Sequence, residues 1–416
     1  MMFGCSDHWI GKRFEHALTE FLTGEEQRRE LRSHDAVDAA AVDTLYDAWR
    51  DTRDAEPAGD PHALANATLA DATGASPTTA SANDVWRSTT APVPLGRVHA
   101  VPSTPETVVL GLLDPTKPPI LTVDSGDVVV YENTWTHFLN KMQPGVEIDA
   151  LAAMRADNPG RGVHSIIGPI AVAGAKPGDV IQLRMLRLET IGFGANLHYP
   201  GKLGTGALPD EFPHGHIEYF ALDPQRGYVE FDERIRLDMK PFQGTIGLAA
   251  EGPGAISSVA PGQHAGNIDL KDLTAGSSLF VPVAHPGGLI FTGDSHALQG
   301  DGEVNITALE TGMKEVRIQV ILHPGAGWRW PFAETPTHWI AMGLDPNLNE
   351  ALRVALRNTI DFLTRKAGLS RDRAYSLASL GIDFRVTQMV DVNNGVHAMI
   401  PKSIFAPDYR KTIAIA

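Results

Sequence analysis

The sequence predicts an α+β protein with a body of mostly antiparallel strands, a C-terminal helical pair and an extra helical arm at its N-terminus. From Val98 onward the chain runs in short β-branched or aromatic segments bounded by Gly, Pro or Asp-Gly turns. Its 40 glycines and 29 prolines indicate a loop-rich β body. Residues 349–378 instead show apolar side chains at helical spacing.

The first predicted element is the helical arm over residues 7–55. Its apolar side chains recur at helical spacing in two runs, Trp9, Phe14, Leu18, Phe21 and Leu22, then Val42, Leu45 and Trp49. Residues 57–94 are rich in Ala, Thr, Ser, Pro and Gly, which is typical of a linker. We therefore expect an N-terminal extension over residues 1–95 and a catalytic domain over residues 96–410.

Short strands fill the first part of the predicted domain, and helices follow them. The predicted strands are 108–113, 120–123, 128–131, 166–172, 180–188, 278–283, 288–291, 304–309 and 315–322, with a short helix at 148–157. The helix over 349–366 carries Leu352, Leu356 and Ile360 on one face, and Gly368 ends it. Ser370 has the side chain of an N-cap for a second helix, which runs through Ala378.

Composition excludes several functional classes. The net charge of −15 is spread along the chain and argues against nucleic acid or an anionic membrane as partner. The single cysteine, Cys5, excludes an intrachain disulfide and a multi-cysteine zinc site. No stretch approaches the roughly 18 apolar residues of a membrane helix, and the first residues lack the apolar region of a signal peptide. We expect a cytoplasmic protein that acts on a small molecule.

Residues 261–307 concentrate ionisable side chains among glycines and short apolar runs. If a strand ends at Phe291, Asp294 and His296 leave its tip on a loop that can point both side chains one way. Carboxylate and imidazole ligands together suit Zn²⁺ or a similar divalent ion with an activated water. Taken singly, Asp-Gly pairs are ordinary turn chemistry and a His beside a strand is commonly structural. The density of such residues here favours an active site.

This stretch resembles the acetamidase/formamidase family of amide hydrolases. The family's (H/N)-G-G-N-x-D-x-K segment reads here as residues 264–271, and its G-D-x-H-x-x-x-G-D-G-E segment as residues 293–303. Ala265 stands where the family has glycine. Residues 168–179, 240–247 and 395–405 resemble further family segments, so the likeness runs from about residue 98 to residue 405. The family's Asp near the end of strand 128–133 is missing beside Trp135.

The resemblance implies an amidohydrolase that cleaves a small linear amide and assembles as a homo-oligomer. The cluster itself motivates the roles, which we state as a hypothesis. Asp269, Asp294 and His296 would bind the metal, Glu303 would be the general base, and Lys271 or His264 would stabilise the oxyanion. Asn267 would bind the substrate amide. His99 and His338 are further candidates for substrate binding, because each lies in a segment that resembles one branch of the family.

Three alternatives stay open. A Glu303–Lys271 pair would act without metal, whereas a serine nucleophile has little support because the chain has no Gly-x-Ser-x-Gly elbow. The same site would equally accept a lactam, a carbamate or an N-substituted amide. From another class, Asp294, Asp301 and Glu303 would hold a calcium ion in a non-catalytic, metal-stabilised β-rich binding protein, although the spacing is not that of an EF-hand.

Overall fold

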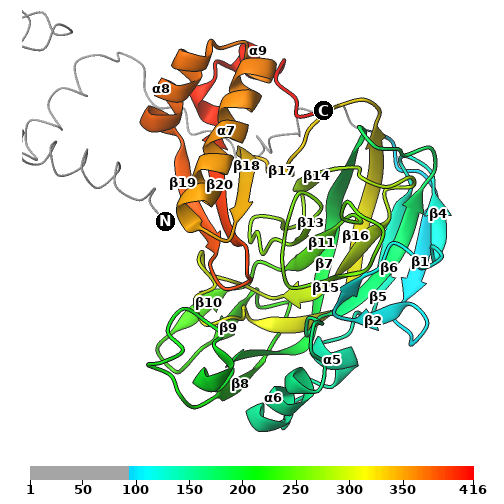
Figure 1. Ribbon diagram of the computed structural model, residues 1–416, viewed down its shortest axis with the longest axis vertical. Helices are drawn as coiled ribbons and strands as arrows, with labels where there is room; N and C mark the ends of the chain where they lie inside the picture. The colour runs from blue at the N-terminus through cyan, green and yellow to red at the C-terminus, as the bar shows by residue number, and fades with distance from the viewer. Residues whose placement is uncertain (1–92) are drawn as a thin grey trace, which may run out of the picture. The chain divides into compact units, whose positions relative to one another are not determined.

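The structure, a computed structural model, describes residues 93–416 (Figure 1). The helical arm and nearly all of the extension over residues 1–95 lie outside the described residues. Both, and the domain boundary after residue 95, therefore stay predictions. In the described part of the chain, no helix is both long enough and apolar enough to span a membrane.

One sheet of 16 strands forms the body of the protein. Along its main path, neighbouring strands follow the order β13 (Ala265–Asn267), β11 (Phe242–Gly247), β15 (Ile290–His296), β16 (Glu310–His323), β7 (Val180–His198), β14 (Ser278–Pro282), β17 (Phe332–Glu334), β18 (His338–Asp345), β20 (Asn394–Pro401) and β19 (Asp383–Gln388). The strands that branch from this path are β6 (Ser165–Val172), β2 (Val108–Leu110), β4 (Leu121–Val123), β5 (Val128–Glu132), β1 (Val98–Pro102) and β8 (His216–Ala221).

The sheet is mostly antiparallel, as predicted. The β1–β5 and β4–β6 pairs are parallel, and the other named strand pairs are antiparallel. Two small sheets accompany it, the hairpin of β9 (Tyr228–Glu230) with β10 (Arg236–Asp238), and β3 (Leu112–Leu113) with β12 (Ile256–Ser257). The helices of the described residues are α5 (His137–Asn140), α6 (Ile148–Ala156), α7 (Leu348–Ala367), α8 (Arg371–Gly381) and α9 (Pro407–Arg410), with 3₁₀ turns at Gly201–Leu203 and Lys402–Ile404.

The predicted C-terminal helical pair is present as α7 and α8. The side chain of Asn347 accepts the first free N–H groups of α7, and Gly368 ends that helix in the left-handed conformation at φ 57°. Ser370 caps α8 by accepting the N–H of Arg373. Helix α7 packs so closely on β18 that a Cβ added at Gly343 would lie 2.1 Å from the carbonyl oxygen of Ala351.

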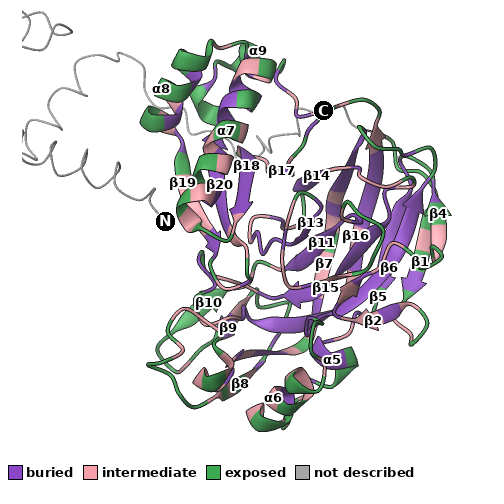
Figure 2. Cartoon of the chain, in the orientation of Figure 1, coloured by how far each residue is buried: buried purple, intermediate pink, exposed green. Residues whose placement is uncertain are grey.

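Burial divides the described residues into a strand core and an exposed helical surface. The central strands are buried along most of their length, whereas α7 and α8 expose their outer faces (Figure 2). The largest apolar cluster joins residues of β5, β6, β7, β15 and β16, and a second cluster lies between α7, α8 and the strands β17, β18 and β20. Burial of this apolar surface is the main stabilising contribution to the fold.

Two differences between the predicted and the observed strands bear on the site. Strand β15 does not end at Phe291 but continues to His296, so Asp294 and His296 lie within a strand and not on a loop. Residues 304–309 form a loop, although a strand was predicted there. The chain cannot extend at this point because Glu303 and Ile306 adopt left-handed φ values of 46° and 90°.

Candidate active site

Asp294 and His296 lie two residues apart on β15, so their side chains project from the same face of the sheet. In the neighbouring strand, Glu310 is the register partner of His296. The Nε2 atom of His296 is 3.2 Å from Oε1 of Glu310 and 3.4 Å from Oδ1 of Asp294. Strand pairing therefore brings an imidazole and two carboxylates into contact.

Eight buried His, Asp and Glu side chains meet around a cavity of about 20 Å³, which we call the polar cluster. Its members are His137, His164, Asp269, Asp294, His296, Glu303, Glu310 and Asp391. They come from well-separated segments: the start of α5, the residue before β6, the segment after β13, strands β15 and β16, and the loops that follow β15 and β19. The fold as a whole, and no single motif, builds the site.

His137 closes one side of the polar cluster. Its Nε2 atom is 2.8 Å from Oδ1 of Asp294 and 3.1 Å from Oε2 of Glu310. The His164 Nε2 atom lies farther away, at 4.0 Å from Oδ2 of Asp294. The two histidine rings meet edge to face with their centroids 5.4 Å apart.

Gln299 fixes the protonation of His296. The Gln299 Nε2 group donates a hydrogen bond of 3.0 Å to the main-chain carbonyl of Asp269, so its Oε1 atom faces the histidine. That oxygen lies 3.1 Å from Nδ1 of His296 and accepts a hydrogen bond from its N–H group. The Nε2 atom of His296 points at Asp294 and Glu310, so it donates to these carboxylates when it is protonated and is the nitrogen left to bind a cation when it is not.

Electrostatics divides the polar cluster into two halves. In the half around Asp294, burial opposes charge, but Glu310 and Asp294 together raise the pKa of His137 to about 9 and that of His296 well above its ordinary value. Burial works against ionisation of Asp294 as well, yet His164 and His296 hold its pKa well below the usual range. Burial lowers the pKa of His164 to about 4.

The other half is a group of three carboxyls. Burial first, and then the charges of its neighbours, raises the pKa of Asp269 to about 7. Burial and the charges of Asp269 and Asp391 raise the pKa of Glu303 well above its ordinary value, and burial and Asp269 do the same for Asp391. In this half the carboxyls hold protons unless a cation compensates their charge.

Three cluster residues adopt a backbone conformation that favours glycine. The φ values are 51° for Asp269, 57° for Asp294 and 46° for Glu303. Each such residue costs on the order of 1–3 kcal/mol and persists only where the surrounding structure enforces it. Local strain of this kind is concentrated at functional sites.

The polar cluster fits a divalent metal ion. Three groups of side chains have ligand atoms within 4.8 Å of one another: His137, His164 and Asp294; Asp294, His296 and Glu310; and Asp269, His296 and Glu303. Several buried atoms also lack a hydrogen-bond partner, namely Nδ1 of His137, both carboxylate oxygens of Asp269 and Oε2 of Glu303. Imidazole and carboxylate donors of this kind suit Zn²⁺ and similar ions.

The predicted metal ligands share the cluster but do not converge on one point. Asp269 approaches Nδ1 of His296 at 3.9 Å, whereas Asp294 approaches Nε2. The two carboxylates thus face opposite nitrogens of one ring, and a single ion cannot bind both nitrogens. Glu303 and Asn267, predicted as base and substrate ligand, both line the cavity. Their roles stay predictions.

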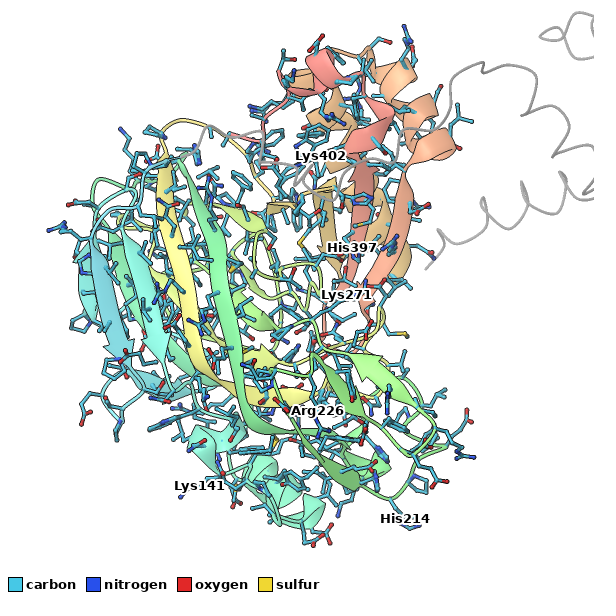
Figure 3. All side chains as sticks on the ribbon, turned by 180° about the vertical axis from the view of Figure 1, so that it is seen from behind. Lys141, His214, Arg226, Lys271, His397 and Lys402 are labelled. Carbon is cyan, nitrogen blue, oxygen red and sulfur yellow. The ribbon has the colours of Figure 1, made fainter. Side chains whose placement is uncertain are left out.

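The other predicted site residues lie outside the cavity lining. Lys271 forms an ion pair of 2.7 Å with Asp301 and lies beside His397 (Figure 3). His264 is buried against a separate surface cavity, and burial lowers its pKa to about 4. His99 contacts Asp127 at 2.8 Å and His338 contacts the Thr337 hydroxyl at 2.9 Å. Because Asp301 pairs with Lys271, it does not line the polar cavity with Asp294 and Glu303, the other two ligands of the calcium alternative.

Sequence reasoning missed His137, His164 and Glu310. His137 lies two residues beyond Trp135, close to the position at which the family has an Asp. That position was the sequence signal that could have led to His137. Glu310 lies between two predicted strands and His164 precedes a third, positions that carry no pattern of their own. Asp391, in the loop that follows β19, also lines the polar cavity.

Comparison with known proteins finds similarity to amide hydrolases. The sequence model of the acetamidase/formamidase family matches residues 250–329. A formamidase of Methylophilus methylotrophus is 27% identical over 323 residues, covering 60% of this chain and 78% of that protein. An acetamidase of Mycolicibacterium smegmatis is 28% identical over 207 residues, 36% of this chain and 51% of that protein.

Solved structures give the same result over more of the chain. The acetamidase of Yersinia enterocolitica has a TM-score of 0.68 at 28% identity and covers 77% of this chain and 97% of that one. The acetamidase of Bacillus halodurans has a TM-score of 0.66 at 27% identity and covers 74% and 98%. The motifs, the fold and these relatives together show that the chain is similar to amide hydrolases of the acetamidase/formamidase family.

Proposed function

We propose that this protein hydrolyses the C–N bond of an amide to a carboxylate and ammonia or an amine, with the polar cluster as its active site. The observation that carries the proposal is that eight buried His, Asp and Glu side chains line one cavity, where three groups of them have ligand atoms within 4.8 Å of one another. Amide hydrolysis needs groups that stabilise negative charge on the carbonyl oxygen and a group that moves a proton to the nitrogen. Relatives named formamidase and acetamidase support the same reaction.

Asp294, His296 and Glu310 are the residues that would hold a divalent ion, with Zn²⁺ as our proposal for its identity. The Gln299 contact leaves Nε2 of His296 as the donor atom, and both carboxylates face that nitrogen. When bound there, the ion would supply an acidified water and polarise the amide carbonyl. Asp269 faces Nδ1 of His296, so it would belong to the proton-holding half and not to the metal ligands.

Glu303 is the residue we propose to move the proton. It lines the cavity, its Oε2 atom has no hydrogen-bond partner, and Asp269 and Asp391 lie close enough to raise its pKa. With a cation bound nearby, Glu303 would be ionised, and as a carboxylate it would take a proton from the attacking water and return it to the leaving nitrogen. Asn267 lines the same cavity, and its Oδ1 accepts a hydrogen bond from Thr245, which leaves its NH₂ group for the substrate.

The metal-free alternative loses support. A Glu303–Lys271 pair requires the two side chains to meet, but Lys271 is paired with Asp301 and does not line the cavity. Small linear amides, lactams, carbamates and N-substituted amides remain chemically compatible with the polar cluster alone. A cytoplasmic location and assembly as a homo-oligomer stay predictions.

The proposal is tested by measuring ammonia release from formamide and acetamide, and amine release from N-substituted formamides, with and without a chelator. We expect release that the chelator abolishes and that added Zn²⁺ restores. If metal analysis shows that the protein contains no metal and release is unaffected, the metal assignment is overturned. The absence of release from every amide, in protein that contains metal, would overturn amide hydrolysis.

A further inference from the structure

A second and larger cavity adjoins the polar cluster. Its volume is about 300 Å³, and it shares the side chains of Glu303 and Thr307 with the polar cavity. Gln299 also lines it and contacts both His296 and Asp269 on its other side. The shared side chains therefore border both spaces. We call the larger one the hairpin cavity, because the β9–β10 hairpin forms part of its wall.

The two cavities differ greatly in size. The polar cavity, at about 20 Å³, has room for an ion or about one water, and for little of a substrate beyond the amide group. The hairpin cavity falls in the range of roughly 300–1,000 Å³ that is typical of small-molecule sites. Formamide or acetamide would leave almost all of it empty.

The lining of the hairpin cavity is mainly apolar. Its large side chains are Phe220, Val229, Phe231, Leu237, Leu298 and Leu309. Phe231 stacks on Phe220 with centroids 5.8 Å apart and an interplanar angle of 21°. The ionisable residues of the lining are Asp301, which pairs with Lys271, and Glu303. Such a wall favours an uncharged apolar group.

The hairpin also leaves apolar side chains open to solvent. Phe231 is 47% exposed and Leu237 is 37% exposed. Both lie in or beside the β9–β10 hairpin, which in Figure 1 lies near β8 and away from α7 and α8. Exposed large apolar side chains that border a cavity commonly mark a binding site.

We infer that the substrate is an amide carrying an apolar group, such as a benzyl group or a chain of several carbons, which binds in the hairpin cavity. This inference rests on the proposed amide hydrolysis and narrows its substrate class. The amide bond would lie at the wall formed by Glu303 and Thr307, within reach of the polar cluster. The apolar group would extend toward Phe220 and Leu237.

The test compares kcat/KM for phenylacetamide, hexanamide and N-benzylformamide with kcat/KM for formamide and acetamide, using the full chain loaded with Zn²⁺. We expect at least one apolar amide to exceed both small amides by about tenfold or more, as a filled apolar pocket allows. The first two substrates place the apolar group on the acyl side, and the third places it on the amine side. Equal or better hydrolysis of formamide and acetamide would overturn the inference and leave amide hydrolysis standing. Failure of every amide would overturn both.

A charged variant at the cavity provides a second readout. Leu237→Asp alters a half-exposed position, so it should fold, and it places a carboxylate in the apolar lining. We expect the ratio of kcat/KM for the best apolar amide to that for formamide to fall by about tenfold. Leu380→Asp is the matched control, because Leu380 is 85% exposed on α8 and does not line the hairpin cavity. An unchanged ratio in Leu237→Asp would contradict the proposed binding mode.

Discussion

Two buried charged sites in this protein differ in how completely their polar atoms are satisfied. Lys402 is 3% exposed, and its Nζ atom contacts Oε1 of Glu334 at 2.8 Å and the carbonyl of Thr335 at 2.7 Å. It also lies over the ring of Trp339, 5.4 Å from the centroid. The polar cluster is buried to a similar degree, yet four of its side-chain atoms have no hydrogen-bond partner: Nδ1 of His137, Oδ1 and Oδ2 of Asp269, and Oε2 of Glu303.

This difference distinguishes buried charged groups that stabilise the fold from buried charged groups that bind something else. A buried ion pair with further hydrogen bonds maintains a fold, and removing one partner is costly. Buried polar atoms without partners destabilise a fold, so they persist where they bind something else. Substitution should therefore lower stability at the Lys402 site and lower activity in the polar cluster.

The largest effect is expected in the polar cluster. Replacing Glu303 with Gln removes the proton-transfer group, so kcat should fall by about 10²–10⁴-fold. The free energy of unfolding should stay equal or increase, because the amide replaces a carboxyl whose pKa is raised by burial and by Asp269. Steady-state kinetics and urea unfolding of the same variant measure both quantities.

The matched control is Glu218→Gln, an exposed change on β8 that should alter neither quantity. A Glu303→Gln variant that retains full activity would remove Glu303 from the mechanism. A large loss of stability in that variant would instead make Glu303 a structural residue, and the contrast between the two sites would disappear.

The Lys402 site should give the reverse result. Lys402→Met removes the cation that Glu334 contacts, and the free energy of unfolding should decrease by about 3–5 kcal/mol. Folded protein should keep its kcat at low temperature, because Lys402 does not line the polar cavity. Urea unfolding and kinetics below the transition measure the two effects.

A double variant tests the cause. Lys402→Met with Glu334→Gln removes both charges, so part of the lost stability should return. If the double variant is less stable than Lys402→Met by the full cost of a second independent change, the ion pair is not the source of the effect.

The sequence predicted the fold more completely than it predicted the residues of the polar cluster. Alternating strands, Asn347, Gly368 and Ser370 carry local signals, so the β body and the helical pair followed from short stretches of chain. The motif residues Asp294, His296 and Glu303 were also found because they lie in one glycine-rich stretch. His137, His164 and Glu310 could not be found this way, since only the long-range pairing of β15 with β16 and β6 brings them together.

His397 gives a third kind of buried group, one that burial keeps neutral. It is fully buried, its Nδ1 contacts the Thr387 hydroxyl at 2.7 Å, and burial lowers its pKa to about 4. Asp301 and Asp272 act to raise this pKa, and Lys271 and Arg385 act to lower it. The neutral ring is thus a property of the folded state.

Stability should therefore depend on pH through His397. Its pKa is about 6.5 in the unfolded chain, so unfolding takes up a proton below that pH. The stabilising contribution is complete above pH 6.5 and is lost as the pH falls toward 4, by about 2 kcal/mol between pH 6.5 and 5. In His397→Gln this part of the dependence should vanish, as urea unfolding at both pH values would show. Parallel pH profiles for the two proteins would exclude the assignment.

The smallest effect concerns backbone strain near the polar cluster. Ala265 is buried at φ 63°, where an alanine costs about 1–2 kcal/mol, and it occupies the position at which the family has glycine. Ala265→Gly relieves that cost but gives the unfolded chain more freedom, so we expect a net gain of up to about 1 kcal/mol by urea unfolding. Ala249→Gly, also buried but outside the left-handed region, should lose about 1 kcal/mol. Ala265, Asp269, Asp294 and Glu303 all carry this strain, whereas Glu334 and Lys402 do not. A loss of stability in Ala265→Gly would mean that the surrounding packing, and not strain, determines the conformation beside the polar cluster.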